Sequence, residues 1–191
     1  MARPRSISNE RLIAAAGIVI GQSGPGFTLA QVAAEAGVAV GTVGQRFGSK
    51  NGLLQALSRL STQQSVDRMR AVALGLDPLV GLRAALMSVY SDLGTAETAA
   101  NNLGQLGADI GDPGLRSLVG EHYAAVEAEI HLLVDAAAPS LPFAPEARRA
   151  ARTLLAVING VALDWSIRPD GLLADRLAQD VDAVLTAWAR T

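Results

Sequence analysis

The stretch GVAVGTVGQRFGSK, residues 37–50, predicts a short helix that binds an anionic partner. It nevertheless holds glycine at positions 37, 41, 44 and 48. A glycine inside a helix costs about 1 kcal/mol relative to alanine. Gly44 lies in the middle of this helix, which raises the question of what the segment is for.

Two predicted helices precede this stretch. Ser8 can cap the first, in which apolar residues between positions 12 and 20 recur at helical spacing. Residues 23–26 (SGPG) break it. Thr28 and Gln31 then predict a capping box, in which the Thr hydroxyl accepts a free backbone N–H and the Gln side chain reaches back to the cap.

The second helix is short and stops at Gly37, which adopts the left-handed conformation at little cost. Residues 40–47 form the third helix, and Ser49 can cap a long fourth one. Two helices joined by a glycine-containing turn allow the second helix to enter a DNA major groove. Ordinary helical hairpins also turn on glycine, so the shape alone leaves DNA binding open.

Composition favours helices throughout the 191 residues. Half of the chain is hydrophobic and 18% is charged, while aromatic residues, which strands favour, make up only 4%. The chain has no cysteine, which excludes disulfides and thiolate chemistry. No apolar run approaches the roughly 20 residues that span a bilayer, and the start MARPRSISNE lacks the apolar core of a signal peptide. We therefore expect a soluble, cytoplasmic protein without membrane partners.

Charge is unevenly distributed along the chain. The net charge is −2, which by itself argues against binding to nucleic acid. Residues 1–60, however, hold six basic and two acidic residues, and the remainder holds ten basic and sixteen acidic ones. A basic N-terminal third on an acidic body is expected when one end meets phosphates and the other does not.

The C-terminal two thirds of the chain also carry the start signals of helices. Asp77-Pro78 and Asp112-Pro113 each place an N-cap before a proline, and Pro145-Glu146 opens another helix. The helix predicted over 145–168 is apolar nearly all round between Leu154 and Trp165, and the last helix carries an apolar stripe. These two helices either pack on their own body or form a four-helix bundle with a second copy.

Residues 12–57 resemble the N-terminal domain of the TetR family of transcriptional regulators. The shared positions, in the same order and at the same spacing, are Ala15-Ala16, Gly24, Thr28, Val32-Ala33, Ala36-Gly37-Val38, Gly41-Thr42-Val43, Phe47, Ser49-Lys50 and Leu53-Leu54. The resemblance implies an all-helical homodimer whose third helix reads double-stranded DNA and whose divergent body binds a small-molecule effector. It assigns DNA contacts to Thr28, Val40, Gly41, Thr42, Gln45, Arg46 and Lys50.

These assignments make chemical sense on their own. Thr28, at a helix start, can bring a hydroxyl and a free N–H to a phosphate. Gly41 allows the helix backbone to approach the duplex, and Gln45 can pair with adenine. Arg46 can read guanine or hold a phosphate, and Lys50 lies at a helix start that favours an anion.

The main departure from the family is Gly44, where an aromatic residue, commonly a tyrosine that meets the phosphate backbone, is usual. Residue 39, often serine in the family, is alanine, and Ile20 stands where phenylalanine is common. We hypothesise that DNA partly orders the recognition helix and that Arg46 and Lys50 take over the phosphate anchoring.

Candidates for regulation are polar or aromatic residues within apolar helices, the kind of lining that a ligand pocket uses. The predicted pocket residues are Tyr90, Gln105, His122, Tyr123, Asn159 and Trp165, each of which can instead be a surface or satisfied core residue. The predicted dimer interface consists of Leu154, Val157, Ile158, Val161, Leu177, Val181, Val184 and Trp188. His122 and His131 lie nine residues apart, which is not a metal-ligand spacing, and we expect neither a metal nor a cofactor.

We also considered an enzyme. Residues 18–26 (IVIGQSGPG) can be read as a strand and a phosphate-binding loop, but they lack the order of a nucleotide-binding motif. The sequence therefore predicts an all-α protein that is not an enzyme, with a helix-turn-helix DNA-binding domain over 1–50 and a larger helical ligand-binding and dimerisation domain over 51–191. We expect a ligand-responsive repressor that binds a palindromic operator as a homodimer. The alternative is a dimeric ligand-binding or protein-interaction module with weakened or lost DNA binding.

Overall fold

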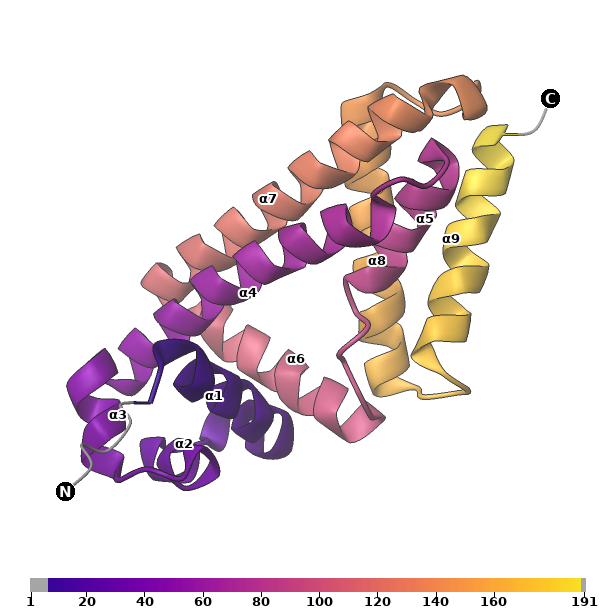
Figure 1. The fold of residues 1–191 in the computed structure, drawn as a ribbon. Coiled ribbons are helices and arrows are strands. Elements are labelled where there is room, and N and C mark those ends of the chain that lie inside the picture. Colours follow the sequence, from indigo (N-terminus) through magenta and orange to yellow (C-terminus); the bar gives the residue numbers. More distant parts are fainter. Residues whose placement is uncertain (1–6, 190–191) are drawn as a thin grey trace. The chain divides into compact units, whose positions relative to one another are not determined.

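The computed structural model describes residues 7–189, and over that range the chain forms helices and no strand. The all-α fold class is confirmed. The helices are α1 (Asn9–Ser23), α2 (Leu29–Ala36), α3 (Val40–Phe47), α4 (Lys50–Ala73), α5 (Pro78–Ser88), α6 (Ala96–Gly111), α7 (Pro113–Ala137), α8 (Ala147–Ile167) and α9 (Leu173–Ala189), with two 3₁₀ turns, η1 (Gly24–Gly26) and η2 (Ala138–Ser140) (Figure 1). Arg3 and Arg5, which contribute to the basic N-terminal third, lie outside the described residues.

The N-terminal helices begin at their predicted caps. Ser8 Oγ accepts a backbone N–H of the first turn of α1 at 3.3 Å. Both bonds of the capping box are formed, from the Gln31 N–H to Thr28 Oγ1 at 3.2 Å and from the Thr28 N–H to Gln31 Oε1 at 2.7 Å. Ser49 Oγ accepts the Gly52 N–H at 3.0 Å and caps α4. Gly37 ends α2 in the left-handed conformation, with φ 70° and ψ 37°.

The later helices begin at their predicted caps, except that one begins two residues later than predicted. Asp77 caps α5, and Asp112 Oδ1 accepts a backbone N–H of the first turn of α7 at 2.9 Å. The helix predicted to open at Pro145-Glu146 begins instead at Ala147. Glu146 has an extended backbone, with ψ 138°, and its carboxylate accepts two first-turn N–H groups, so Glu146 is the N-cap.

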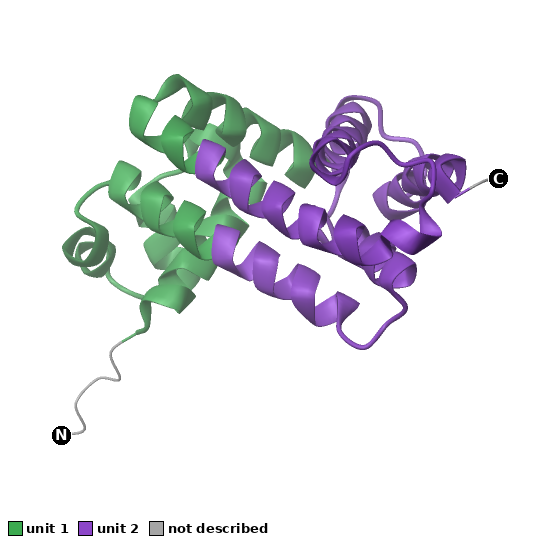
Figure 2. Ribbon diagram, turned by 90° about the horizontal axis from the view of Figure 1, so that it is seen from above, with its two compact units in different colours: residues 1–61, 97–119 green, residues 62–96, 120–191 purple. Residues whose placement is uncertain are grey.

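The chain divides into two compact units (Figure 2). Unit 1 comprises the described residues up to 61 together with 97–119, and unit 2 comprises 62–96 and the described residues from 120 onward. Helices α4 and α7 therefore contribute residues to both units, and nearly all of α6 belongs to unit 1. The functional boundary between residues 50 and 51 remains a prediction. The structural division falls later in α4 and adds residues 97–119 to the first unit.

Unit 1 has a single apolar core, made by α1, α2, α3, the first part of α4 and the first part of α7. Fully or almost fully buried in it are Leu12, Ala16, Phe27, Val32, Val43 and Leu53, with Leu115 and Leu118 from α7. Val38 and Phe47, which we predicted as core, are partly buried against it. The core holds the two short helices, α2 and α3, in place on α1 and α4.

Unit 2 is built on α8 and α9, which pack along each other and against α5. Within α8 the side chains of Ala150, Leu154 and Ile158 are fully buried, as is Val181 in α9. By length and composition alone, the 21 residues of α8 would reach across a bilayer, which the sequence expectation did not foresee. Helix α8 turns its buried residues towards α5 and α9, as a core helix does.

Candidate nucleic-acid interface and regulatory residues

Helix α3 has one face in the core of unit 1 and one face in solvent. Val43 is fully buried, whereas Val40 is 53% exposed. Gly41 and Gln45 are exposed, and Thr42 is half-buried. The predicted DNA-contacting positions of α3 therefore lie away from the core, where a duplex can reach them. An exposed valine beside a glycine suits contact with a thymine methyl group, and Gln45 retains its amide for base edges.

Thr28 lies exposed at the start of α2, and its hydroxyl already serves the cap. Besides accepting the Gln31 N–H, the Thr28 Oγ1 lies 3.0 Å from Gln31 Oε1, to which it donates. The side chain of Gln31 also donates to Ser23 Oγ at 3.4 Å. The capping box thus fixes the first turn of α2, and a phosphate would meet the remaining free N–H groups there.

Arg46 is exposed but bonded within unit 1. Its Nη1 donates to Asn9 Oδ1 at 2.9 Å, and its Nη2 donates to the carbonyl oxygen of Ile7 at 3.4 Å. The guanidinium therefore ties the end of α3 to the start of α1. The sequence could not indicate this pairing, because Arg46 and Asn9 are 37 positions apart.

Lys50 is also bonded within the unit. Its Nζ donates to the carbonyl oxygens of Pro25 and Phe27, both at 2.7 Å, and lies 4.1 Å from the centroid of the Phe27 ring. The predicted phosphate contacts of Arg46 and Lys50 stay predictions, but in this structure both cations hold turns of the helix-turn-helix together.

Gly44 has free space around it. A Cβ placed on Gly44 would have no neighbouring atom within 4 Å, and the same holds for Gly41. The missing aromatic at position 44 is therefore not replaced by packing from elsewhere. The recognition helix carries glycine there without a steric reason.

Five of the six predicted pocket residues belong to unit 2. Tyr90 donates its hydroxyl to Asn159 Oδ1 at 2.6 Å, and the rings of His122 and Tyr123 lie 6.0 Å apart. Burial raises the pKa of Tyr90, with a smaller contribution from Tyr123, and burial lowers the pKa of His122. His122 Nδ1 also lies 3.2 Å from the hydroxyl oxygen of Thr62. We call Tyr90, His122, Tyr123 and Asn159 the polar cluster of unit 2.

Gln105 belongs to unit 1 and is not a member of the polar cluster. It is 6% exposed and donates to Asp109 Oδ1 at 2.7 Å, whereas its Oε1 is buried without a hydrogen-bond partner. Burial raises the pKa of Asp109. A buried acceptor of this kind is suited to a donor from water or a ligand.

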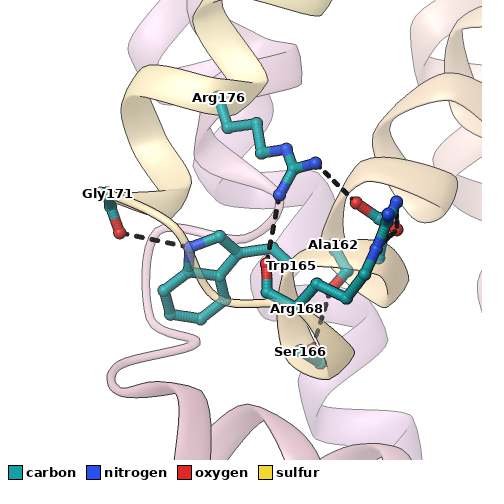
Figure 3. A network of polar contacts seen from close by, with 7 residues as sticks. Ala162, Trp165, Ser166, Arg168, Gly171 and Arg176 are labelled. Atoms are coloured by element: carbon teal, nitrogen blue, oxygen red, sulfur yellow. Dashed lines mark hydrogen bonds and ion pairs between the residues drawn. The ribbon is translucent and has the colours of Figure 1, made fainter.

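Trp165 lies at the end of α8 and is buried. Its indole Nε1 donates to the Gly171 carbonyl at 3.3 Å, across the loop that leads to α9 (Figure 3). Beside it, Asp164 bonds both Arg168 and Arg176, the latter at 2.6 Å. Trp165 thus closes the α8–α9 loop, and its role in a pocket stays a prediction.

Most of the residues predicted for a dimer interface are buried within the single chain. Leu154, Ile158, Leu177 and Val181 are 0–1% exposed and Val161 is 8% exposed, while Val157, Val184 and Trp188 are half-buried. Within one chain the first five residues are therefore packed in the core of unit 2, and the predicted dimer interface stays a prediction. The outer face of α8 carries Leu163 and Ile167, which are 46% and 65% exposed, and Leu172 in the loop before α9 is 67% exposed.

Sequence reasoning missed a groove between α4 and α7 in unit 2, with a volume of about 310 Å³. Its lining includes Thr62, Val66, Arg70, Ala128, Glu129 and Leu132. The carboxylate of Glu129 is almost completely buried, and its Oε2 accepts a hydrogen bond from Arg70 Nε at 2.8 Å and forms an ion pair with Arg70 Nη2 at 2.8 Å. The two partners are 59 positions apart, and no local pattern links them.

The comparisons with known proteins agree with this architecture. Residues 12–57 match the tetR family of bacterial regulatory proteins, and residues 78–190 match the C-terminal region of BetI-type transcriptional repressors. The HTH-type transcriptional regulator BetI of Burkholderia cenocepacia (strain HI2424) is 33% identical over 190 residues, which cover 96% of each chain.

Solved structures share the fold over nearly the whole length. The TetR transcriptional regulator SCO0520 from Streptomyces coelicolor has a TM-score of 0.69 at 25% identity, over 96% of this chain and 99% of that one. FadR from Bacillus subtilis, in complex with stearoyl-CoA, has a TM-score of 0.76 at 20% identity, over 96% of this chain and 100% of that one.

A helix-turn-helix with an outward third helix, followed by a helical body, defines a DNA-binding transcriptional regulator. The chain belongs to the TetR family, and its C-terminal region is of the BetI repressor type. The predicted family is confirmed.

Proposed function

We propose that this protein is a ligand-responsive repressor that binds a near-palindromic operator as a homodimer. The observation that carries the proposal is α3: Val43 anchors it in the core, while Val40, Gly41 and Gln45 face solvent. Two such helices related by a twofold axis would enter successive major grooves about 34–36 Å apart. The operator DNA also implies that the protein works in the cytoplasm.

The exposed face of α8 and the loop towards α9 support the dimer. Leu163, Ile167 and Leu172 are large apolar side chains left in solvent by a single chain, and Ala156 and Gly160 continue the stripe on α8. Exposed apolar side chains beside small residues allow two helices to approach closely and suit a four-helix bundle. A Cβ placed on Gly160 meets nothing within 4 Å in one chain.

The dimer can be tested with Gly160→Arg, a large charged side chain on the proposed interface. We expect the variant to elute as a monomer with unchanged helical content. Gly107→Arg is the matched control, because Gly107 is also an exposed helical glycine with open space around it. A Gly160→Arg protein that stays dimeric would rule out this face.

The polar cluster of unit 2 supports a small-molecule effector. A tyrosine hydroxyl, an amide and a histidine within an apolar body are polar groups of the kind that fix a ligand's orientation. The relative FadR was solved with stearoyl-CoA. An effector lowers operator affinity only by as much as it prefers the non-binding state of the protein.

The first experiment is selection of the purified protein on random duplexes at several salt concentrations, followed by sequencing. Enrichment of a palindrome supports the repressor, and the slope of affinity against salt counts the phosphate contacts. If nothing is enriched at low salt, the proposed repressor function fails.

A second function has a specific observation in its favour. Gly44 lacks the family's aromatic, and Arg46 and Lys50 are bonded within unit 1. These features would suit a dimeric ligand-binding protein that keeps the fold and has lost DNA binding. The same selection decides between the two functions.

A further inference from the structure

We propose that Lys50 is a positioning residue rather than a phosphate contact. Its ammonium bonds the first turn of α4 to the turn before α2, and this contact determines how the helix-turn-helix is positioned relative to α4. The inference rests on the proposed DNA-binding function, because its effect is read at the operator.

The geometry leaves the Lys50 ammonium little capacity for DNA. A lysine has three N–H donors, and two of them go to the carbonyl oxygens of Pro25 and Phe27 at 2.7 Å. The face of the Phe27 ring lies 4.1 Å from the same nitrogen. Charge-assisted bonds to two carbonyls, together with a ring face, hold the ammonium group within unit 1.

The position of Lys50 in its helix explains why it needs these partners. It is the first residue of α4, where the aligned N–H groups carry partial positive charge and disfavour a cation. The carbonyl oxygens at the end of η1 offset that repulsion. Phe27 is 1% exposed, so the ring that faces Lys50 is itself fixed in the core of unit 1.

We call helices α1 to α3 with the first turn of α4 the reading head. The contact joins two parts of it that are distant in sequence. Lys50 is 23 positions from Phe27, and Phe27 immediately precedes the capping residue Thr28. Helix α4 contributes residues to both units. A shift of α4 at its first turn is therefore passed through Lys50 to the start of α2, and from there to the turn before α3.

The test compares Lys50→Gln and Lys50→Arg with Arg59→Met, all in the full chain. Arg59 is an exposed cation on α4 within unit 1, so its variant controls for the removal of one positive charge. The measurements are operator affinity, its salt dependence, affinity for operators with altered half-site spacing, and hydrogen exchange at residues 27–31.

If Lys50 is a positioning residue, Lys50→Gln weakens operator binding by about tenfold, as expected when charge-assisted bonds are removed. The salt slope stays that of the wild type, and the preference for one half-site spacing becomes broader. Lys50→Arg does not fully restore binding, because a rigid planar fork cannot reproduce the contacts of a compact ammonium with two carbonyls. Exchange at residues 27–31 becomes faster in both variants and is unchanged in Arg59→Met.

A direct bond between Lys50 and a phosphate gives the opposite pattern and overturns the proposal. The salt slope then falls by about one, because the variant neutralises one phosphate fewer. Lys50→Arg binds as well as the wild type, and the spacing preference and exchange are unchanged. A general decrease in stability would lower the active fraction but leave the spacing preference intact, which also overturns the proposal. If the wild type selects no operator, the proposed function fails, while the exchange measurement still decides whether Lys50 holds residues 27–31.

Should Lys50→Gln fail to fold, Phe27→Leu removes the ring and keeps both carbonyls. It is expected to change spacing preference and exchange in the same direction, by a smaller amount. Unchanged exchange in a folded Phe27→Leu protein would count against the ring's part in holding Lys50.

Discussion

Alanine in place of Gly52 tests the tightest backbone approach in unit 1. A Cβ on Gly52 would lie 2.1 Å from the carbonyl oxygen of Phe47 and 3.2 Å from its carbon. Ordinary C···O contacts are about 3.3–3.6 Å, so the overlap exceeds about 1 Å. The Phe47 carbonyl cannot turn aside freely, because it accepts the Ser49 N–H at 2.8 Å.

The size of the effect follows from two opposing contributions. Overpacking against a fixed backbone costs about 3 kcal/mol, and replacing a helical glycine by alanine returns about 1 kcal/mol. We therefore expect Gly52→Ala to lower the free energy of unfolding by about 2 kcal/mol. For a chain of this length that corresponds to a decrease in Tm of about 4–8 °C.

Gly44→Ala is the matched control, because it is the same substitution in a helix of the same unit with no atom within 4 Å. It should raise stability by about 1 kcal/mol, or Tm by about 2–4 °C. Both variants are compared by urea and thermal unfolding, followed through the helical circular dichroism signal. Equal stabilisation by the two alanines would refute the close approach at Gly52.

Three further predictions concern the reading head and the polar cluster. Gly44→Tyr should bind the operator about fivefold more tightly than Gly44→Phe, because only the hydroxyl can bond a phosphate, a gain of about 1 kcal/mol; equal affinities would contradict this. Tyr90→Phe removes the 2.6 Å bond to Asn159 and should cost about 1–3 kcal/mol in urea unfolding, part of which a second change, Asn159→Leu, should restore. Burial lowers the pKa of His122 from 6.5, so the folded state disfavours its protonation. Neutral His122 therefore makes its full contribution to the free energy of unfolding above the pKa of the unfolded state, and this contribution decreases as the pH falls below that value. Urea midpoints measured from pH 7 down to pH 5 should show a smaller decrease in His122→Gln than in the wild type.

The predictions that the structure confirms depend on interactions between near neighbours in the chain. Ser8, Thr28 with Gln31, and Asp77 each cap a helix two or three residues away. Gly37 ends α2 with a backbone that glycine reaches at little cost. One sequence was sufficient for these features, because both partners stand within one turn of each other.

The sequence did not separate core residues from surface residues on α8 and α9. Leu154 and Val181 lie on apolar stripes, but a stripe does not say whether its own chain or a second copy covers it. The structure places both in the core, and it leaves Leu163 and Ile167 exposed on the outer face. Only the packing of α8 on α9 separates the two sets.

The sequence by itself determined the helices, their caps and the family, because helix periodicity and capping act over a few residues and the reading-head motif spans about 45. The tertiary structure alone decided what the two cations of the reading head do. Arg46 reaches Asn9, and Lys50 reaches Pro25 and Phe27, over separations of 23 to 37 positions. A charged side chain binds whatever acceptor the fold brings within about 3 Å, and that acceptor is set by the packing of α1, η1 and α4 rather than by the residues beside it in the chain.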